Sequence, residues 1–524
     1  MAPLLDDHNG GLHNANGSPT LCQVAIIGAG SRGNAYAAAT IASRLGIVVA
    51  VVEPIDFKRN LLGSKYIWKG RKPSTGEAFK DWRGFIESQR QSNADAAGSH
   101  ASTSPPRVDA VFVCVRDELH AEVVTALAPL NLHLMCEKPL ATTLQDCLRI
   151  QKALQSYPQK IFAIGHVLRY SPHNLLLRDL VLNRKVIGDV LSIEHTEPVG
   201  WWHFAHSYVR GNWRKESYTA PSLLTKSCHD IDWLLWMLCS PPPGTDRLAP
   251  HLPTTISSTG TLNLFRKSRK PVAAGSATNC LSCPLQNTCL YSAKRIYLDR
   301  HLLKAKNTDW PVDIVNPEIE TIHSTQGPAA AQQALLTSLA EDYDASKTPT
   351  CDIESRPWFG RCVWESDNDV CDDQHVLLTW EDEDAAHPAR KAKTASFHMI
   401  ASTLAQCERR GRIYGSTGEI SYDSSRITVH DFTNDETRRF APELPKHSHH
   451  GGGDQGLTEQ FLKAVEAVES GRMTVGEAQG EYLGVTVEEA VRSHAVVFAA
   501  EEARRTARVV GWREWWEDVQ ARMG

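Results

Sequence analysis

The sequence predicts an α/β fold that begins with a doubly wound parallel sheet, and three observations support it. A short apolar run at 22–27 suits a buried parallel strand and leads directly into a glycine-rich turn and an alanine-rich helix at 34–43. A second apolar run at 47–52 ends at an acidic residue. Two further apolar runs, at 109–115 and 132–136, are separated by a segment of helical composition. Short strands that alternate with helices are typical of βαβ units.

The turn after the first strand has the spacing of a dinucleotide-binding loop. In such a loop the first glycine makes a tight turn, the second lets the backbone approach a pyrophosphate, and the third lets helix and strand pack closely. The helix that follows offers free N–H groups and the positive end of its dipole to the phosphates. The residues of the turn that we expect to bind the cofactor are Gly28, Gly30, Ser31, Arg32 and Gly33.

The second strand ends at Glu53, which lies 20 residues beyond Gly33. A carboxylate at this spacing is expected to accept hydrogen bonds from the adenosine ribose hydroxyls. It would also repel a 2′-phosphate, so the sequence favours NAD over NADP. Arg59 argues in the other direction, because a nearby arginine can accommodate that phosphate.

Several polar residues follow the ends of the next two strands, where open parallel sheets bind their ligands. Asp117 and His120 come after the strand at 109–115, and Glu137 and Lys138 come after the strand at 132–136. We expect Asp117, His120 and Glu137 to line the cofactor site. Pro139 biases Lys138 towards an extended backbone, which fixes the direction of its side chain.

The order of these motifs resembles the glucose–fructose oxidoreductase / inositol dehydrogenase / MocA (Gfo/Idh/MocA) family. The resemblance is carried by the glycine turn, "VFVCVRDELHAEV", "LMCEKPLATT", "IGDVLSIEH", "SCHDIDWLLW" and "RRGRIYGSTGEI", and it covers most of residues 20–510. It implies an NAD(P)-binding Rossmann domain at 20–160 and a C-terminal α/β domain at 161–524. The family's second domain has a large, mostly antiparallel sheet that lines the substrate site and often pairs two subunits, so we expect a homo-oligomer.

The resemblance also implies a catalytic pair. Lys138 takes the position of the family's active-site lysine and His229 that of its catalytic histidine. A histidine suits proton transfer near neutral pH, and a lysine can stabilise a developing alkoxide. Many family members have an aspartate one helical turn before the histidine, where this chain has Thr225. Either another carboxylate replaces it, or Lys138 and His229 divide the proton transfer differently.

The segment 200–214 is the predicted substrate loop, because it is rich in aromatic and cationic residues that suit sugars. The alternative is an aromatic element that packs against the sheet. The residues predicted to contact substrate are Arg169, Tyr170, Trp202, His206, Arg210, Asn212 and Lys226.

Thirteen cysteines without a signal-peptide pattern favour reduced thiols in the cytoplasm. Cys280, Cys283 and Cys289 cluster in an insertion around 240–350. They could hold a structural zinc if Cys228 or a histidine supplied a fourth ligand, and packed free thiols are the alternative. The clusters at 447–450 and 367–373 fit a glycine loop and an acidic turn better than metal sites.

Composition excludes other classes of function. A net charge of −5 without a basic stripe argues against nucleic-acid binding, and no apolar run is long enough to cross a membrane. Residues 1–19, 91–107 and 240–253 are polar or rich in proline and are predicted to be disordered or loops. At 58.0 kDa the chain can form two or three domains.

Three functions fit these observations. The first, which we favour, is an NAD-dependent dehydrogenase or reductase acting on a sugar, cyclitol or related polyol. The second is a redox-neutral NAD-using enzyme, a glycosidase or epimerase that oxidises and then re-reduces its substrate. The third is a non-catalytic dinucleotide sensor, which the presence of both Lys138 and His229 argues against.

Overall fold

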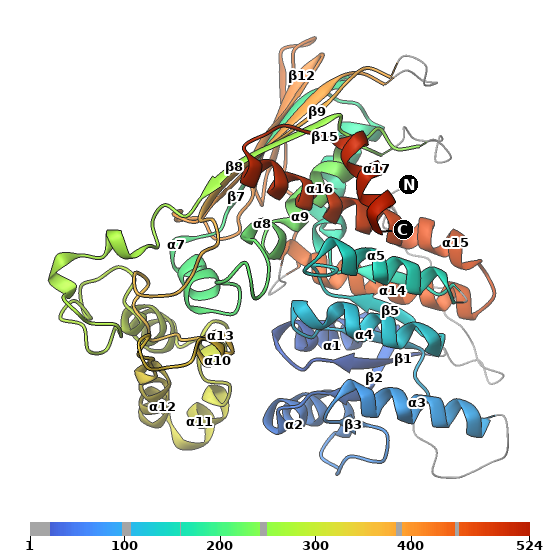
Figure 1. Cartoon of the computed structure of the whole chain (residues 1–524). Coiled ribbons are helices and arrows are strands. Elements are labelled where there is room, and N and C mark those ends of the chain that lie inside the picture. Colours follow the sequence, from blue (N-terminus) through green and yellow to red (C-terminus); the bar gives the residue numbers. More distant parts are fainter. Residues whose placement is uncertain are drawn as a thin grey trace.

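The computed structural model describes residues 21–96, 106–157, 159–240, 249–383, 390–445 and 450–523. The predicted disordered segment 1–19, most of 91–107 and 240–253, and residues 447–449 lie outside this part of the chain. Figure 1 shows three regions: a parallel sheet with its helices at the lower right, a large sheet at the top, and a helical insertion at the lower left.

The N-terminal sheet has six parallel strands in the order β3-β2-β1-β4-β5-β6. The chain reverses its winding between β1 and β4, and dinucleotides bind at such a switch point. This confirms the predicted doubly wound sheet. The strands are β1 (Cys22–Ile27), β2 (Gly46–Val52), β3 (Ala78–Phe79), β4 (Ala110–Val113), β5 (His133–Cys136) and β6 (Phe162–Ile164), and the helices are α1 (Ser31–Ser43), α2 (Asp56–Gly63), α3 (Trp82–Ala96), α4 (His120–Leu127) and α5 (Leu144–Gln155).

Two features bear on the domain boundary predicted at residue 160, because segments that follow this residue join the first sheet or pack onto it. Strand β6 pairs with β5, so the first sheet extends beyond that boundary. Helix α14 (Gly453–Glu469), from the C-terminal part of the sequence, packs onto the same sheet, where Phe461 meets Phe112 edge to face at 5.4 Å. The segment 91–96, predicted as a loop, belongs to α3.

The second sheet has nine strands in the order β14-β13-β12-β11-β7-β10-β9-β8-β15, and all its pairs are antiparallel except β7 with β10. This confirms the large, mostly antiparallel sheet. Buried and accessible residues alternate along β9, as expected when one face is covered. On that face the rings of His195 and Trp233 stack at 4.5 Å. The strands are β7 (Val190–Pro198), β8 (Thr255–Thr261), β9 (Asp373–Trp380), β10 (Lys393–Ile400), β11 (Arg410–Gly415), β12 (Gly418–Tyr422), β13 (Ile427–Asp431), β14 (Glu436–Phe440) and β15 (Val510–Gly511), and the covering helices are α9 (Cys228–Leu238) and α16 (Val487–Thr506).

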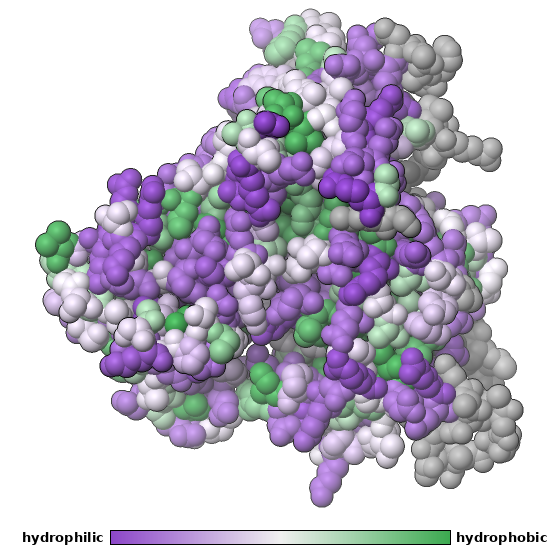
Figure 2. Space-filling model, viewed as in Figure 1, coloured by the Kyte–Doolittle hydropathy of each residue, from purple (hydrophilic) through white to green (hydrophobic). Residues whose placement is uncertain are grey.

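The insertion lies between β8 and β9, later in the chain than the predicted 240–350. It has its own small core, which includes Tyr297, Leu335 and Leu339. Its main helices are η9 (Lys294–Lys304), α11 (Ile319–Gln326) and α12 (Pro328–Ala340). On the face shown in Figure 2 hydrophobic residues occur in small groups among hydrophilic ones. In the described part of the chain, no helix is long and apolar enough to span a membrane.

Candidate active site

The glycine turn between β1 and α1 combines two packed glycines with one open glycine. Gly28 has φ +100°, and a Cβ there would lie 2.3 Å from the carbonyl oxygen of Cys114 on β4. A Cβ on Gly33 would lie 2.0 Å from the carbonyl oxygen of Gly28. A Cβ on Gly30 would meet no atom within 4 Å. The turn is therefore packed against the sheet on one side and open above Gly30 and the first N–H groups of α1, a cradle that fits a pyrophosphate.

Glu53 directly follows β2 and closes the other side of this turn. Its two carboxylate oxygens accept hydrogen bonds from the backbone N–H groups of Ala29 at 2.9 Å and Ile55 at 3.0 Å. Each oxygen keeps a further lone pair for a ribose hydroxyl. Arg59, on the same side of the sheet, donates to the carbonyl of Glu53 and forms an ion pair with Asp56, so a carboxylate already neutralises its charge.

Lys138 lies just beyond β5 and connects the two domains. Its peptide bond to Pro139 is cis, and its Nζ donates a 2.8 Å hydrogen bond to the carbonyl oxygen of Thr225 in α8 (Ser222–Thr225). The Thr225 hydroxyl donates to the carbonyl of Pro221 instead. At the position of the family's aspartate, the lysine is thus held by a neutral backbone group.

His229, in the first turn of α9, lies near two other histidines, the buried His166 and the accessible His450. Its ring centroid is 5.8 Å from that of His166 and 5.9 Å from that of His450. Its Nδ1, and both ring nitrogens of His166, have no hydrogen-bond partner among the described residues. Burial first, and then the charge of Lys138, hold the pKa of His229 well below its usual range. Burial also lowers the pKa of His166 to about 4, so both imidazoles are neutral at pH 7.

Arg32, predicted to contact the cofactor, forms ion pairs with two carboxylates. Its Nε donates to Glu137 at 2.7 Å, and its terminal nitrogens donate to Asp454 in α14 at 2.7 and 2.9 Å. Glu137 also accepts a 2.5 Å hydrogen bond from the Tyr36 hydroxyl. The side chains of Arg32 and Glu137 therefore join α1, β5 and α14 beneath the site. The guanidinium of Arg32 is thus engaged by two carboxylates, and a contact between Arg32 and the cofactor stays a prediction.

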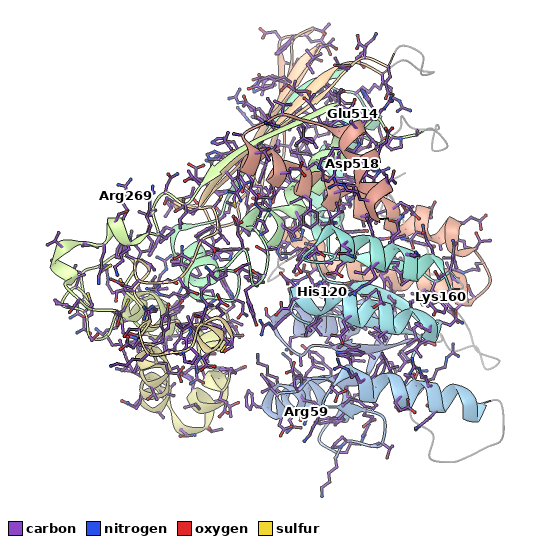
Figure 3. All side chains as sticks on the ribbon, viewed as in Figure 1. Arg59, His120, Lys160, Arg269, Glu514 and Asp518 are labelled. Carbon is purple, nitrogen blue, oxygen red and sulfur yellow. The ribbon has the colours of Figure 1, made fainter. Side chains whose placement is uncertain are left out.

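The two residues predicted after β4 also connect segments of the protein. The Asp117 carboxylate accepts a 2.7 Å hydrogen bond from the indole N–H of Trp213, and burial raises its pKa. His120 is fully buried, and its ring nitrogens lie 2.7 Å from the carbonyl of Pro139 and 3.2 Å from that of Val115. Figure 3 labels this histidine on the edge of the parallel-sheet domain that faces the rest of the molecule. Both ring nitrogens thus face backbone carbonyls, and a contact between His120 and the cofactor stays a prediction.

A network of ion pairs that the sequence analysis missed lies beside α9. Lys226 is 2.9 Å from Glu197 at the end of β7, and Arg409 is 3.0 Å from the same carboxylate. Arg409 also pairs with Asp230 at 2.8 Å. The Nζ of Lys226 lies 3.0 Å from the Sγ of Cys407. Lys226, a predicted substrate residue, thus belongs to a buried charged cluster whose members come from three separate segments.

Most of the predicted substrate loop packs against the insertion instead. The ring of Trp202 lies 4.5 Å from that of His301, and His206 is hydrogen-bonded to the Tyr297 hydroxyl at 2.9 Å. Arg210 donates to two backbone carbonyls and is 1% exposed. Trp202, His206 and Arg210 therefore pack as the alternative of an aromatic element describes, and their contact with substrate stays a prediction. Asn212 is partly accessible, and its substrate contact stays a prediction.

Arg169 and Tyr170 have structural partners as well. Arg169 forms a bidentate ion pair with Asp232 at 2.7 and 2.8 Å, and the Tyr170 hydroxyl donates to the carbonyl of Leu483. Both border a cavity of about 280 Å³ on the α14 side, whose lining includes neither Lys138 nor His229. These hydrogen bonds hold both side chains away from Lys138 and His229, and their contact with substrate stays a prediction.

Comparison with known proteins agrees with the fold and with the glycine turn. Residues 22–166 match the model of the oxidoreductase family with an NAD-binding Rossmann fold. The chain is 31% identical over 140 residues to inositol 2-dehydrogenase of Paracoccus denitrificans, covering 26% of this chain and 38% of that protein. It is 30% identical over 138 residues to 2,7-anhydro-N-acetylneuraminate hydratase of Escherichia coli, covering 26% and 36%. The matches span less than half the length of these curated relatives.

The likeness in fold extends over almost the whole chain. A levoglucosan dehydrogenase, solved with NADH and levoglucosan, superposes with a TM-score of 0.56 at 13% sequence identity. The alignment covers 94% of this chain and 99% of that protein. At such low identity the match shows that the two-domain fold is shared.

Proposed function

We propose that this chain, a member through residues 22–166 of the Gfo/Idh/MocA oxidoreductase family, is an NAD-dependent dehydrogenase or reductase that acts on a CH–OH group of a sugar, cyclitol or related polyol. One observation carries the proposal. Next to the glycine turn, a lysine held by a backbone carbonyl adjoins a buried neutral histidine whose Nδ1 is unpartnered among the described residues. An unpaired base beside an ammonium group suits removal of a hydroxyl proton.

The residues of this chain would divide the reaction as follows. NAD, when bound, supplies the hydride acceptor at the nicotinamide ring. The ammonium group of Lys138 would donate a hydrogen bond to the substrate oxygen and stabilise the negative charge that develops there. His229 would accept the hydroxyl proton at its free Nδ1, and in the reverse direction it would return that proton. Lys138 disfavours a positive charge on His229, which keeps the base neutral before reaction.

The surroundings of Glu53 support NAD as the cofactor rather than NADP. A 2′-phosphate there would approach a carboxylate that already accepts two backbone hydrogen bonds. Arg59, which could otherwise compensate, is paired with Asp56. A second negative charge would therefore meet net repulsion at this position.

A polyhydroxylated substrate is supported by the chemistry of the C-terminal side and by the relatives. Asn212, which is partly accessible, offers both a hydrogen-bond donor and an acceptor. Related proteins are named for inositol and for an anhydro sugar acid, and the similar structure contains levoglucosan. The hydratase among them keeps a redox-neutral reaction as the second candidate, because it is not named for net oxidation.

We further propose that the protein is a cytoplasmic homo-oligomer. None of its thirteen cysteines is in a disulfide, which suits a reducing compartment. The uncovered face of the nine-stranded sheet exposes Leu377 on β9, which is 43% accessible. Sedimentation of the purified chain would measure its oligomeric state, and Leu377→Lys should shift an assembly formed through this face towards monomer.

Titration with NAD⁺ by calorimetry, followed by a screen of sugars and cyclitols at 340 nm, tests the proposal. We expect NAD⁺ to bind and NADH to form with at least one polyol. Lys138→Ala should keep cofactor binding and lose turnover. Tight binding with product formation but no change at 340 nm would favour the redox-neutral reaction. Binding without any turnover would favour a sensor, and a chain that binds no dinucleotide would refute the proposal.

A further inference from the structure

Four cysteines from two distant segments line one small cavity in the insertion. Cys280, Cys283 and Cys289 come from the first loop of the insertion, and Cys362 comes from its end. The sequence analysis named the first three and suggested Cys228 as the fourth. Cys228 lies instead at the start of α9 and is absent from the lining of this cavity.

The backbone builds the cavity by pairing the two segments and folding the first loop over them. The N–H of Cys280 donates to the carbonyl of Gly360 at 2.8 Å, and the N–H of Cys362 donates to that of Thr278 at 2.7 Å. These bonds place Cys280 and Cys362 on neighbouring extended segments. Successive turns bring round the rest of the loop: the N–H of Cys283 donates to the carbonyl of Cys280, and that of Cys289 to the carbonyl of Leu285.

Arg210 gives the cavity a positive charge whose counter-ion is missing. It is 1% exposed, and its Nη2 lies 3.4 Å from the Sγ of Cys280. Its other acceptors are the carbonyls of Arg361 and Tyr291, and no carboxylate of the described residues pairs with it. Its Nη1 is buried without any partner in the same part of the chain. A buried guanidinium needs a negative partner, and thiolates at this position would provide it.

We propose that Cys280, Cys283, Cys289 and Cys362 are thiolate ligands of a metal centre. Thiolates require a cation to hold them in an apolar cavity, and here the remaining lining includes Leu285, Val363 and Trp364. The N–H of Leu285 points at the Sγ of Cys283 at 3.4 Å, a contact that orients a metal-bound sulfur. Arg210 would offset part of the net negative charge that four thiolates bring to the centre.

Four thiolates are the donor set of a structural zinc site. Four sulfurs around one zinc at about 2.3 Å lie about 3.8 Å from one another. Among the described residues, the one group of three or more ligand atoms that all lie within 4.8 Å of one another is Asp373, His375 and His398, so the four sulfurs stand further apart in the structure than zinc would hold them. The cysteine side chains would therefore close around the ion when it binds.

The centre would fasten the insertion to the segment that leads into the active site. Arg210 ends the helical segment η6 (Ala205–Arg210), and its carbonyl accepts a 3.0 Å hydrogen bond from the N–H of Trp358. The four ligands thus join both ends of the insertion at the point where they meet η6. We expect loss of the metal to loosen the insertion before it affects the parallel sheet.

Metal analysis of the full chain, purified without oxygen, tests this proposal. We expect about one zinc per chain. Cys362→Ser should lose most of the metal, and the matched control Cys228→Ser should retain it. Equal zinc contents in the two variants would overturn the assignment of Cys362 as a ligand.

A second measurement does not depend on the folding of a variant. Alkylation of the native wild-type protein, mapped by mass spectrometry, should leave the four cysteines unlabelled until the metal is removed with a chelator, after which they should react. The exposed Cys351 should react to the same extent before and after, and serves as the internal control. Absence of stoichiometric metal, or equal labelling of the four cysteines in both states, would overturn the proposal.

Discussion

The two walls of the candidate active site are built in different ways. The wall from the parallel sheet consists of the turn Gly28–Gly33 and of Glu53, where backbone groups define the shape and neighbouring residues supply the contacts. The wall from the C-terminal domain is a constellation of side chains, including His166, His229 and Arg409, from segments far apart in the sequence. The first wall is shaped for a dinucleotide, whereas the second wall holds the side chains to which we assign the chemistry and the choice of substrate.

The walls also differ in how they treat charge. Beneath the glycine turn, Arg32 is matched by Glu137 and Asp454, so the charges there are neutralised before any ligand arrives. On the opposite wall, burial keeps His166 and His229 neutral with open nitrogens next to Lys138. The ammonium group of Lys138 disfavours a positive charge on the neighbouring imidazole, so His229 stays neutral before the substrate binds. We therefore assign cofactor binding and proton transfer to different walls. Variants in one wall should change one of these functions and leave the other unchanged.

The largest expected effect separates chemistry from binding. His229→Asn should lower kcat by about 10²- to 10⁴-fold, because the acceptor of the hydroxyl proton is lost. The dissociation constant for NAD⁺ should stay unchanged, since the glycine turn is untouched. Steady-state kinetics and calorimetry measure the two quantities. His430→Asn, at an accessible histidine on β13, is the control and should behave like the wild type. A normal kcat for His229→Asn would mean that the C-terminal wall does not supply the base.

The next effect distinguishes two roles of the glycine turn: Gly30 leaves space for the cofactor, and Gly28 packs against the sheet. Gly30→Val should weaken NAD⁺ binding at least about tenfold and leave the free energy of unfolding within about 1 kcal/mol, because its side chain enters open space. Gly28→Ala should instead destabilise the protein by about 3 kcal/mol or more, since its Cβ would clash with the carbonyl of Cys114 and its φ is +100°. Calorimetric titration and urea unfolding distinguish the two variants. Equal losses of binding and stability in both would contradict the open cradle above Gly30.

The family resemblance predicted the first wall well because its signals are local. The glycine turn and the carboxylate at the end of the next strand lie within one short stretch of sequence, so both can be recognised from their spacing. Partners from distant segments were not visible. Arg32 stands where a phosphate contact is expected, yet it meets Asp454, which lies 422 residues further along the chain.

The second wall and the cysteine cavity could be predicted only in part. His229 follows from a motif, but its neighbours come from distant segments. His166 follows β6 of the parallel sheet, and Glu197 and Arg409 are brought together by the order of strands in the large sheet, which no short motif encodes. Cys362 was missed for the same reason, because it meets Cys280 only after the insertion has folded back. Aromatic residues in 200–214 indicated a substrate loop, although burial against a second core requires the same residue types.

A smaller effect tests the departure at Thr225. Thr225→Asp would place a carboxylate near Lys138 and His229, which favours the imidazolium and raises the pKa of His229. Since the protonated histidine cannot accept a proton, the acid limb of the kcat/KM profile should move to higher pH, by up to about one unit. Thr225→Val keeps the carbonyl that holds Lys138 and should leave the profile unchanged. Thermal unfolding of both variants shows whether they fold. A folded Thr225→Asp with an unmoved profile would mean that His229 is not the titrating base.

The smallest effect compares the stability of the two regions during acidification. Burial lowers the pKa of His206, beside the insertion, to about 3, so the folded protein keeps it neutral while the unfolded chain binds a proton near pH 6.5. Its contribution is therefore complete above pH 6.5 and declines as the pH falls towards 3. Glu469, which anchors β5 and α14, has its pKa lowered to about 2, so its contribution declines only below about pH 4.5. Between pH 6.5 and 5.5, His206→Gln should lose about 1 kcal/mol less unfolding free energy than the wild type, whereas Glu469→Gln should follow the wild-type slope. Urea unfolding at the two pH values measures this difference. Equal slopes for all three proteins would mean that His206 is accessible to protons in the folded state, and that the insertion is less tightly packed than the parallel sheet.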